Sequence, residues 1–261
     1  MGRVEEKIAL ISGGARGLGR AMAEDLVAEG ARVVIGDVLA DAGAETAREL
    51  GDAVHFVQLD VTSEESWASA VRSTVEAFGS LNVLVNNAGT AEGAAFEETT
   101  LESYRRVTEV NQTGVFLGMR AVVEAMGAAG GGSIINISSI DGMVGSPGII
   151  SYIASKWAVR GMTKAVAMEL APRGIRVNSI HPGHVHTLLA SEPGQDRVPI
   201  EAMIEEHTKR IAPMSRTGLP SEIAKMATFL ASDDSSYCTG SEFVVDGGFT
   251  AGYPSPGAPQ T

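Results

Sequence analysis

Two side chains that together could move a proton lie near the middle of the sequence. Tyr152 and Lys156 are four residues apart, and on a helix this spacing places both on one face with their Cβ atoms about 5–6 Å apart. A lysine ammonium favours the phenolate form of a nearby tyrosine, so we expect the pKa of Tyr152 to lie below its ordinary value of about 10. Such a tyrosine can exchange protons near neutral pH.

A third polar side chain, Ser139, follows the apolar run at residues 134–137 (IINI). This run is typical of a buried parallel strand. The serine hydroxyl is therefore expected at the carboxyl end of a strand, where open α/β sheets bind ligands. An isolated tyrosine and lysine at helical spacing are more often an exposed surface pair, so the chemical interpretation depends on the rest of the chain.

The elements that must position these residues alternate along the sequence. Short apolar runs predict strands at residues 8–11, 32–36, 54–58, 83–85, 133–137, 176–180 and 243–245. Amphipathic stretches predict helices at residues 17–29, 40–50, 63–78, 101–126, 151–170 and 220–231. Thr62 and Glu65 fit a capping box at the start of the third helix.

This alternation predicts an α/β fold: a single-domain, Rossmann-type, doubly wound parallel sheet of about seven strands with helices on both faces. We expect the domain to span residues 1–251, because no linker-like composition interrupts the pattern before that point. Residues 252–261 form a tail rich in proline and glycine, which is expected to be extended.

Composition excludes several classes of partner. The 261 residues carry a net charge of −12, which argues against binding to nucleic acid or to an anionic membrane surface. Cys238 is the single cysteine, so no internal disulfide can form and a reducing cytosol is indicated. The sequence shows neither a signal peptide nor an apolar run of about 20 residues, and we expect a soluble, cytoplasmic protein.

A glycine-rich turn joins the first predicted strand to the first helix. Gly13, Gly17 and Gly19 lie in this turn, where backbone N–H groups can approach a pyrophosphate at the positive end of the helix dipole. The spacing differs from the G-x-G-x-x-G pattern, and a purely structural turn is the alternative. Its position between a strand and a helix favours a dinucleotide site.

The second predicted strand is followed by Asp37, which lies 20 positions after Gly17 (37 − 17). At this offset a carboxylate can accept hydrogen bonds from the adenosine ribose. The same charge repels the additional phosphate of NADP, so NAD is the expected cofactor. Arg16 could bind that phosphate. The phosphate would then lie beside the unpaired carboxylate of Asp37, so we expect Asp37 to determine the choice of cofactor. The alternative is that Asp37 only caps the next helix.

Further motifs follow in a fixed order along the chain: Ser12 to Gly19 (SGGARGLG), Asp60 before Val61, Asn86 to Gly89 (NNAG), Asn111 in VNQTGVF, Ser139, Tyr152 with Lys156, Pro182-Gly183 followed by Thr187, and Asp246 to Gly248 (DGG). Together they resemble the short-chain dehydrogenase/reductase family over nearly the whole chain. The resemblance implies cofactor contacts at Gly13, Arg16, Gly17, Leu18, Gly19, Asp37, Asp60, Val61, Asn87, Ala88, Gly89, Tyr152, Lys156, Pro182, Gly183, Val185 and Thr187.

The resemblance also implies a mechanism. Tyr152 takes a proton from a secondary alcohol while a hydride passes to the nicotinamide, and reduction reverses both transfers. Ser139 hydrogen-bonds the substrate oxygen, and Lys156 binds the nicotinamide ribose. Asn111 holds a water of a proton relay, or is a buried structural asparagine.

No metal is expected. His181, His184 and His186 cluster in the sequence, but no cysteine or carboxylate accompanies them at ligand spacing.

The substrate is expected to be a bulky hydrophobic alcohol or ketone. Residues 184–215 form an apolar segment that in the family closes over the substrate, and Ile140, Met143 and Val144 would add an apolar wall. The alternative is that these residues only pack the lid onto the body of the protein.

Within the family the chain most resembles the bacterial NAD-linked 3α(20β)-hydroxysteroid dehydrogenases. The alternatives are a 3-oxoacyl-(acyl-carrier-protein) reductase and a dinucleotide-binding sensor that has lost catalysis. The family also implies a homotetramer built from helices 101–126 and 151–170.

Overall fold

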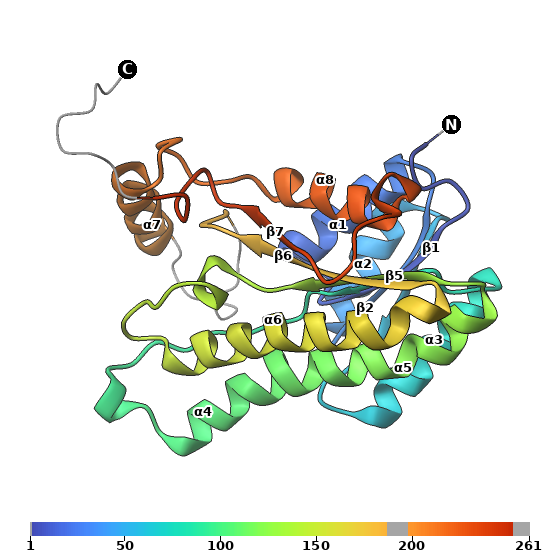
Figure 1. Cartoon of the computed structure of the whole chain (residues 1–261), viewed down its shortest axis with the longest axis horizontal. Coiled ribbons are helices and arrows are strands. Elements are labelled where there is room, and N and C mark those ends of the chain that lie inside the picture. Colours follow the sequence, from blue (N-terminus) through green and yellow to red (C-terminus); the bar gives the residue numbers. More distant parts are fainter. Residues whose placement is uncertain (1, 187–197, 253–261) are drawn as a thin grey trace.

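Seven parallel strands form one sheet at the centre of the computed structural model, which describes residues 2–186 and 198–252 (Figure 1). The strands are β1 Ile8–Ser12, β2 Arg32–Asp37, β3 Val54–Gln58, β4 Val83–Asn86, β5 Gly132–Ile137, β6 Ile175–Pro182 and β7 Glu242–Val245. Their order is β3-β2-β1-β4-β5-β6-β7, and every neighbouring pair is parallel. The predicted fold class is confirmed. Because the order reverses between β1 and β4, a crevice opens there at the carboxyl ends of the strands.

Helices cover both faces of this sheet (Figure 1). They are α1 Gly17–Ala28, α2 Ala40–Leu50, α3 Glu64–Phe78, α4 Leu101–Thr108, α5 Gly114–Ala128, α6 Ile150–Leu170, α7 Val198–Ile211 and α8 Pro220–Ala231. Helices α1, α2 and α8 lie on one face, and α3, α5 and α6 lie on the other.

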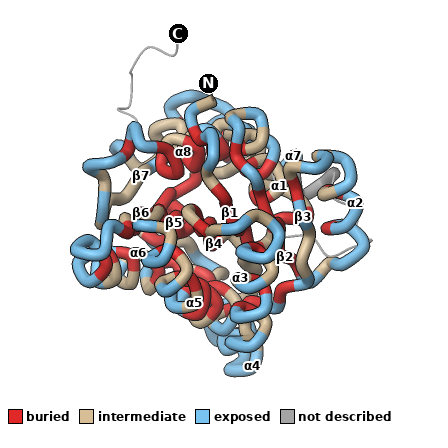
Figure 2. The backbone as a smooth tube through the Cα atoms, turned by 90° about the vertical axis from the view of Figure 1, so that its right-hand side faces the viewer, coloured by how far each residue is buried: buried red, intermediate tan, exposed pale blue. Residues whose placement is uncertain are grey.

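The apolar core is divided by the sheet because successive strand residues point to opposite faces. In β1, Ala9 and Ile11 pack against α1 and α8, whereas Leu10 packs against α3 and α5. Trp67 of α3 is 1% exposed and is among the largest side chains of the second core. Figure 2 shows the buried residues concentrated along the strands and the inner helix faces. Burial of each such aliphatic side chain stabilises the fold by about 1.5–3 kcal/mol.

The predicted helix 101–126 is not continuous. A π-helical turn, η2 Glu109–Thr113, separates α4 from α5. A π turn holds one extra residue, so the side chains before and after it face directions that a regular helix would not give them. Asn111 lies in this turn and is fully buried. The hydrophobic pattern could not reveal a one-residue insertion, and the prediction of one helix is wrong at this point.

The predicted capping box of the third helix is also wrong. Ser63 is the N-cap of α3, and its hydroxyl accepts a hydrogen bond from the backbone N–H of Ser66 at 3.2 Å. Thr62 instead donates to the carboxylate of Asp60 at 2.7 Å. Helix α7 was not predicted as a separate element and was included in the segment 184–215.

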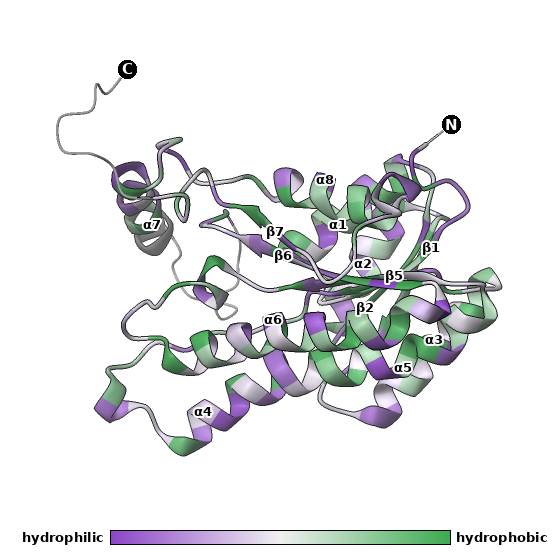
Figure 3. Ribbon diagram, in the orientation of Figure 1, coloured by the Kyte–Doolittle hydropathy of each residue, from purple (hydrophilic) through white to green (hydrophobic). Residues whose placement is uncertain are grey.

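Hydrophobic residues gather on the helix faces that meet the sheet, while α4 is largely hydrophilic (Figure 3). Among the helices that the structure describes, none combines the length and the apolar composition that crossing a bilayer requires.

Candidate active site

A cleft with a volume of about 410 Å³ lies at the carboxyl ends of the strands, where the strand order reverses. Its lining residues are Gly13, Arg16, Gly17, Leu18, Asp37, Val38, Leu39, Leu59, Asp60, Val61, Asn87, Ala88, Gly89, Thr90, Val110, Ile137, Ser138, Ser139, Tyr152, Lys156, Pro182, Gly183 and Val185. Nearly all the predicted cofactor contacts therefore lie around one cavity.

The glycine turn at one end of the cleft leaves no room for a side chain at Gly13 or at Gly19. A Cβ on Gly13 would lie 2.8 Å from the Cα of Ala88, and Gly13 has a φ of +67°. A Cβ on Gly19 would lie 2.1 Å from the carbonyl oxygen of Gly13. Asn87, which directly follows β4, ties the turn to the end of that strand. Its side-chain amide donates to the carbonyl oxygens of Ser12 and Gly13, both at 3.0 Å.

The first turn of α1 opens toward this cleft with free donors. Its N-cap residue, Arg16, makes no capping hydrogen bond with its side chain, and the first N–H groups of a helix have no intrahelical partner. Gly17 and Leu18 of this turn line the cleft. Backbone donors at a helix N-terminus bind phosphate, so these residues fit the pyrophosphate of a dinucleotide.

Asp37 connects the glycine turn to the loop before α2. Its Oδ2 accepts from the backbone N–H of Ala15 and its Oδ1 from that of Leu39, both at 3.0 Å. Leu39, and not Asp37, is the N-cap residue of α2. Asp37 also lines the cleft together with Arg16. A carboxylate has about four acceptor positions, so two remain for the hydroxyls of a ribose.

Ser139, Tyr152 and Lys156 meet at the other end of the cleft. Tyr152 is 8% and Lys156 is 4% exposed, and the lysine Nζ lies 5.4 Å from the centre of the tyrosine ring. Lys156 donates to the carbonyl oxygen of Ile137 at 2.9 Å. The helical spacing that suggested this pair thus places both side chains on the cleft-facing side of α6.

The predicted lowering of the tyrosine pKa is wrong in this structure. Burial raises the pKa of Tyr152 to about 12, a hydrogen bond with Ser139 opposes that rise, and the charge of Asp141 adds to it. Burial also lowers the pKa of Lys156 to about 8. The physical reason is that removing water disfavours both the phenolate and the ammonium. Sequence spacing cannot show this effect.

Asn111 does not line the cleft. Its side-chain N–H group donates to the carbonyl oxygen of Thr90 at 2.8 Å and to the Ser155 hydroxyl at 3.2 Å, and its oxygen accepts from the Thr90 N–H at 2.8 Å. These bonds anchor the π turn to the loop after β4. The structural alternative for Asn111 therefore has direct support, and its part in a proton relay stays a prediction.

Two other predicted contacts differ from the rest. Gly19 lies beneath the glycine turn and is not a lining residue. Thr187 lies outside the described residues. Seven lining residues were not predicted: Val38, Leu39, Leu59, Thr90, Val110, Ile137 and Ser138. Most of them directly neighbour a predicted residue in the sequence, and only this adjacency could have indicated that they line the cleft.

Asp141 is the most consequential omission. Its Oδ2 lies 3.3 Å from the Ser139 hydroxyl, and its backbone N–H donates to the same hydroxyl at 3.0 Å. Its charge raises the pKa of both Tyr152 and Lys156. This acid stands two residues after Ser139 in the sequence, where only the apolar residues Ile140, Met143 and Val144 were assigned a role.

Those apolar residues lie outside the lining of this cleft, and their part in a substrate wall stays a prediction. Ile140 is 3% exposed and packs inside, and Val144 is 37% exposed. Neither they nor Met143 line the cleft.

The three histidines separate in space. His181 bonds the Ser139 carbonyl oxygen, whereas His184 bonds the Thr208 hydroxyl and His186 bonds that of Thr217.

Comparisons with known proteins agree with this fold. Residues 13–250 match the protein-family model described as enoyl-(acyl carrier protein) reductase. The 3-alpha-(or 20-beta)-hydroxysteroid dehydrogenase of Mycobacterium tuberculosis is 51% identical over 251 residues, covering 96% of this chain and 92% of that protein. The trans-4-hydroxycyclohexanecarboxylate dehydrogenase of Sinomonas cyclohexanicum is 48% identical over 259 residues, covering 96% and 95%.

A solved structure is similar over nearly its full length. The crystal structure of a short-chain type dehydrogenase/reductase from Mycobacterium marinum matches with a TM-score of 0.88 and 34% sequence identity, covering 95% of this chain and 97% of that one. The class that the fold and cleft define is an oxidoreductase acting on CH–OH groups. The chain belongs to the short-chain dehydrogenase/reductase family.

Proposed function

We propose that the protein transfers a hydride between NAD(H) and a bulky hydrophobic secondary alcohol or ketone, with hydroxysteroids as the first substrate class. The observation that carries this proposal is the meeting of Ser139, Tyr152 and Lys156 at one end of a cleft whose other end fits a dinucleotide. The relatives named as dehydrogenases of hydroxysteroids and of a hydroxycyclohexane acid support the substrate class.

The chain's own residues handle the proton and the orientation. Tyr152 takes the proton of the alcohol during oxidation and returns it during reduction. Ser139 hydrogen-bonds the same substrate oxygen, and its bond to the phenol favours the phenolate. Lys156 binds the nicotinamide ribose. When bound, the nicotinamide supplies the hydride acceptor or donor.

NAD is the proposed cofactor because Asp37 lies where the adenosine ribose would bind. The next residue, Val38, is 59% exposed and supplies no cation for a 2′-phosphate. Arg16 lines the same region and is the residue that would relax the preference.

A substrate panel with both cofactors tests the proposal. Turnover of hydroxysteroids, cyclic secondary alcohols and 3-oxoacyl thioesters is measured with NAD(H) and with NADP(H), and NADH binding is titrated by fluorescence. The expected result is higher kcat/KM for hydroxysteroids with NAD(H). Preference for the thioester would favour the acyl-carrier-protein reductase alternative, and binding of NADH without any turnover would favour the sensor.

We also propose assembly as a homotetramer through the helices on the α4–α6 side of the sheet. Exposed apolar side chains there include Leu101 of α4, Phe116 of α5 and Trp157 and Met168 of α6, at 62%, 46%, 46% and 80% exposure. Light scattering measures the assembled mass, and a monomer would contradict the proposal. The expected cytoplasmic location stays a prediction.

A further inference from the structure

Two side chains, one buried and one half-buried, hold the backbone around Ser139 from outside the cleft. His181 of β6 is 0% exposed, and its Nδ1 lies 2.9 Å from the carbonyl oxygen of Ser139. Arg160 of α6 donates from Nη1 to the carbonyl oxygen of Gly142 at 2.9 Å. These two carbonyls belong to the N-cap residue and to the last residue of the short helical turn η3, Ile140–Gly142. Neither His181 nor Arg160 lines the cleft. We call this pair the carbonyl clamp.

The hydrogen bonds of His181 determine which ring nitrogen carries the proton. A carbonyl oxygen only accepts, so Nδ1 must donate to Ser139. Nε2 is then the acceptor in a neutral ring, and the Ser179 hydroxyl lies 2.9 Å from it. Burial lowers the pKa of His181, while nearby Glu242 raises it and Arg160 and Lys156 lower it further. The ring is therefore a neutral donor of fixed orientation.

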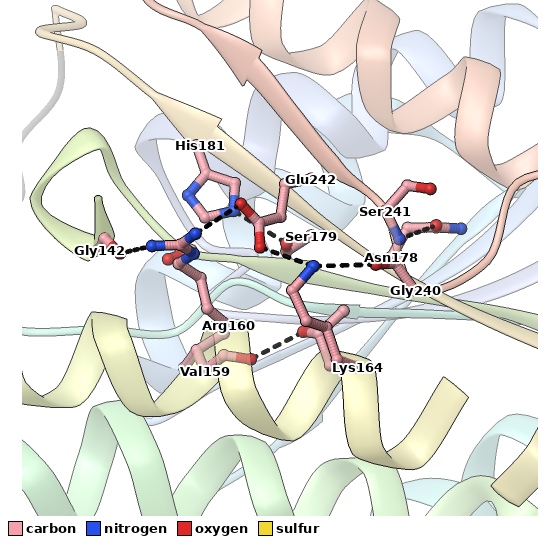
Figure 4. Close-up of polar contacts among 12 residues, drawn as sticks. Gly142, Val159, Arg160, Lys164, Asn178, Ser179, His181, Gly240, Ser241 and Glu242 are labelled. Carbon is pink, nitrogen blue, oxygen red and sulfur yellow. Dashed lines mark hydrogen bonds and ion pairs between the residues drawn. The ribbon is translucent and has the colours of Figure 1, made fainter. Parts of the chain in front are cut away.

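Arg160 is held in turn by a carboxylate from the last strand (Figure 4). Its Nη2 lies 2.9 Å from Glu242 of β7, and Lys164 contacts the other carboxylate oxygen at 2.9 Å. The Arg160 and Glu242 side chains are only 24% and 15% exposed. An ion pair this sheltered holds its geometry better than an exposed one.

The helix that carries Tyr152 also carries Arg160, one of the two residues of the clamp. Tyr152, Lys156, Arg160 and Lys164 are spaced by four residues along α6, so they follow one side of the helix. The first two reach the cleft, and the last two reach the Gly142 carbonyl and Glu242. One rigid element thus relates the position of the phenol to that of the serine.

The Ser139 hydroxyl has two alternative partners, Tyr152 and Asp141, so its orientation depends on how the backbone around it is held. The Ser139 hydroxyl oxygen accepts a hydrogen bond from the backbone N–H of Asp141 at 3.0 Å, and the hydroxyl donates to the Asp141 carboxylate at 3.3 Å. It also hydrogen-bonds Tyr152. If the carbonyls of Ser139 and Gly142 were released, the hydroxyl could turn fully to the carboxylate and lose its hydrogen bond with the phenol.

We propose that His181 and Arg160 are positioning residues that act through Ser139, by holding the backbone so that its hydroxyl faces Tyr152 and the substrate oxygen. The inference rests on the catalytic role proposed above for Ser139. A misplacement of about 1 Å in such a group can lower turnover by about a hundredfold.

A double-mutant cycle tests this proposal. His181→Leu removes both ring nitrogens at similar volume, and it is made in the parent and in Ser139→Ala. The expected result is a fall in kcat of about tenfold in the parent but less than about twofold in Ser139→Ala, because no hydroxyl remains to be placed. The dissociation constant of NADH should change little. His181→Asn keeps a donor at the position of Nδ1 and should restore most of the lost activity.

The pH profile adds a readout that a purely structural effect would not move. Because the Ser139 hydrogen bond lowers the pKa of Tyr152, its loss should move the profile of alcohol oxidation to higher pH in both His181→Leu and Ser139→Ala. Equal losses of kcat in the two backgrounds would overturn the inference. An unchanged kcat in Ser139→Ala alone would instead overturn the catalytic role of Ser139.

A second variant covers the case that His181→Leu does not fold. Arg160→Met, at a half-buried position, should show the same dependence on Ser139. Its matched control is Arg173→Met, because Arg173 also donates to a backbone carbonyl, that of Val123 at 3.2 Å, but lies after α6, before the amino end of β6. The control should leave kcat and its pH profile unchanged. A similar loss in the control would refute a specific action of Arg160.

Discussion

The two ends of the cleft are built in different ways. The dinucleotide end is formed by backbone, and its glycines matter because they lack side chains: Gly13 and Gly19 have no space for a Cβ. The catalytic end is formed by buried side chains, Tyr152 and Lys156, whose pKa values are shifted in opposite directions by loss of water. Close backbone packing determines the shape of the dinucleotide end. Loss of water determines the pKa values at the other end.

This difference predicts different consequences of mutation. Changes at the glycine turn should reduce cofactor affinity, because they displace the backbone donors. Changes at the catalytic end should reduce turnover or move its pH profile while the cofactor still binds.

Removing the phenolic hydroxyl should have the largest effect. Tyr152→Phe deletes the group that exchanges the proton, so kcat should fall by at least about a thousandfold. NADH should still bind with a dissociation constant within about threefold of the parent. Turnover is measured with the best substrate of the panel, and substantial residual activity would show that another group moves the proton.

Filling the glycine turn should mainly weaken binding. In Gly19→Ala the new Cβ would lie 2.1 Å from the Gly13 carbonyl oxygen and 2.7 Å from the Asn87 amide nitrogen. Displacement of the Gly13 carbonyl and of the Asn87 side chain that bonds it should weaken NADH binding by about a hundredfold. Gly51→Ala is the control, because Gly51 has a φ of +80° with open space around it. It should lower stability slightly and leave binding unchanged.

The buried lysine should make stability depend on pH. Below about pH 8 the lysine is charged both folded and unfolded, and burial of that charge destabilises the fold. Between its folded pKa of about 8 and the ordinary value of 10.5, only the unfolded chain holds the proton, so stability rises with pH.

Urea denaturation of the parent and of Lys156→Met measures this effect. From about pH 7 to about pH 9.5 the parent should gain about 2 kcal/mol of unfolding free energy relative to the variant. Lys225→Met removes an exposed lysine and should show no such trend. If the difference in unfolding free energy between the parent and Lys156→Met did not change with pH, the predicted burial of the lysine charge would be contradicted.

Removing the acid beside the ribose position should change cofactor choice moderately. Asp37→Ala takes away the repulsion of a 2′-phosphate, so the ratio of kcat/KM for NAD over NADP should fall by about tenfold. Asp41→Ala removes an equal charge from the first turn of α2, outside the cleft lining. An equal change in both variants would indicate a general charge effect.

Neutralising the acid beside the serine should have the smallest effect. Asp141 raises the pKa of Tyr152, so Asp141→Asn should move the profile of alcohol oxidation to lower pH and raise neutral-pH turnover by about threefold. Ser146→Ala removes a hydrogen bond of 2.6 Å to the same carboxylate without removing its charge. If the pH profile of Ser146→Ala also moved to lower pH, the position of the Asp141 side chain, and not its charge, would explain the effect.

Much of the fold and site was predictable because it depends on local pattern. Apolar runs and amphipathic stretches predicted all seven strands, with bounds that differ from the structure by at most two residues. The parallel order then places the ends of β1, β2, β4 and β5 along one edge. The predicted motif residues that follow these strands consequently meet in one cleft.

The π turn, the role of Asp141 and the clamp could not be predicted from such patterns. Inserting one residue in a helix barely changes its hydrophobic period, yet it redirects Asn111 toward Thr90. His181 and Arg160 are 21 residues apart (181 − 160), and only the packing of β6 against α6 brings both to the Ser139 loop.

The sequence by itself determined the fold, the glycine turn and the types of the candidate catalytic residues, because periodicity and backbone sterics act over short stretches of chain. Tertiary structure alone decided how strongly Tyr152 and Lys156 hold their protons. The physical reason is that a pKa depends on the water and charge surrounding a group. That environment is created by elements distant in sequence, which enclose both side chains.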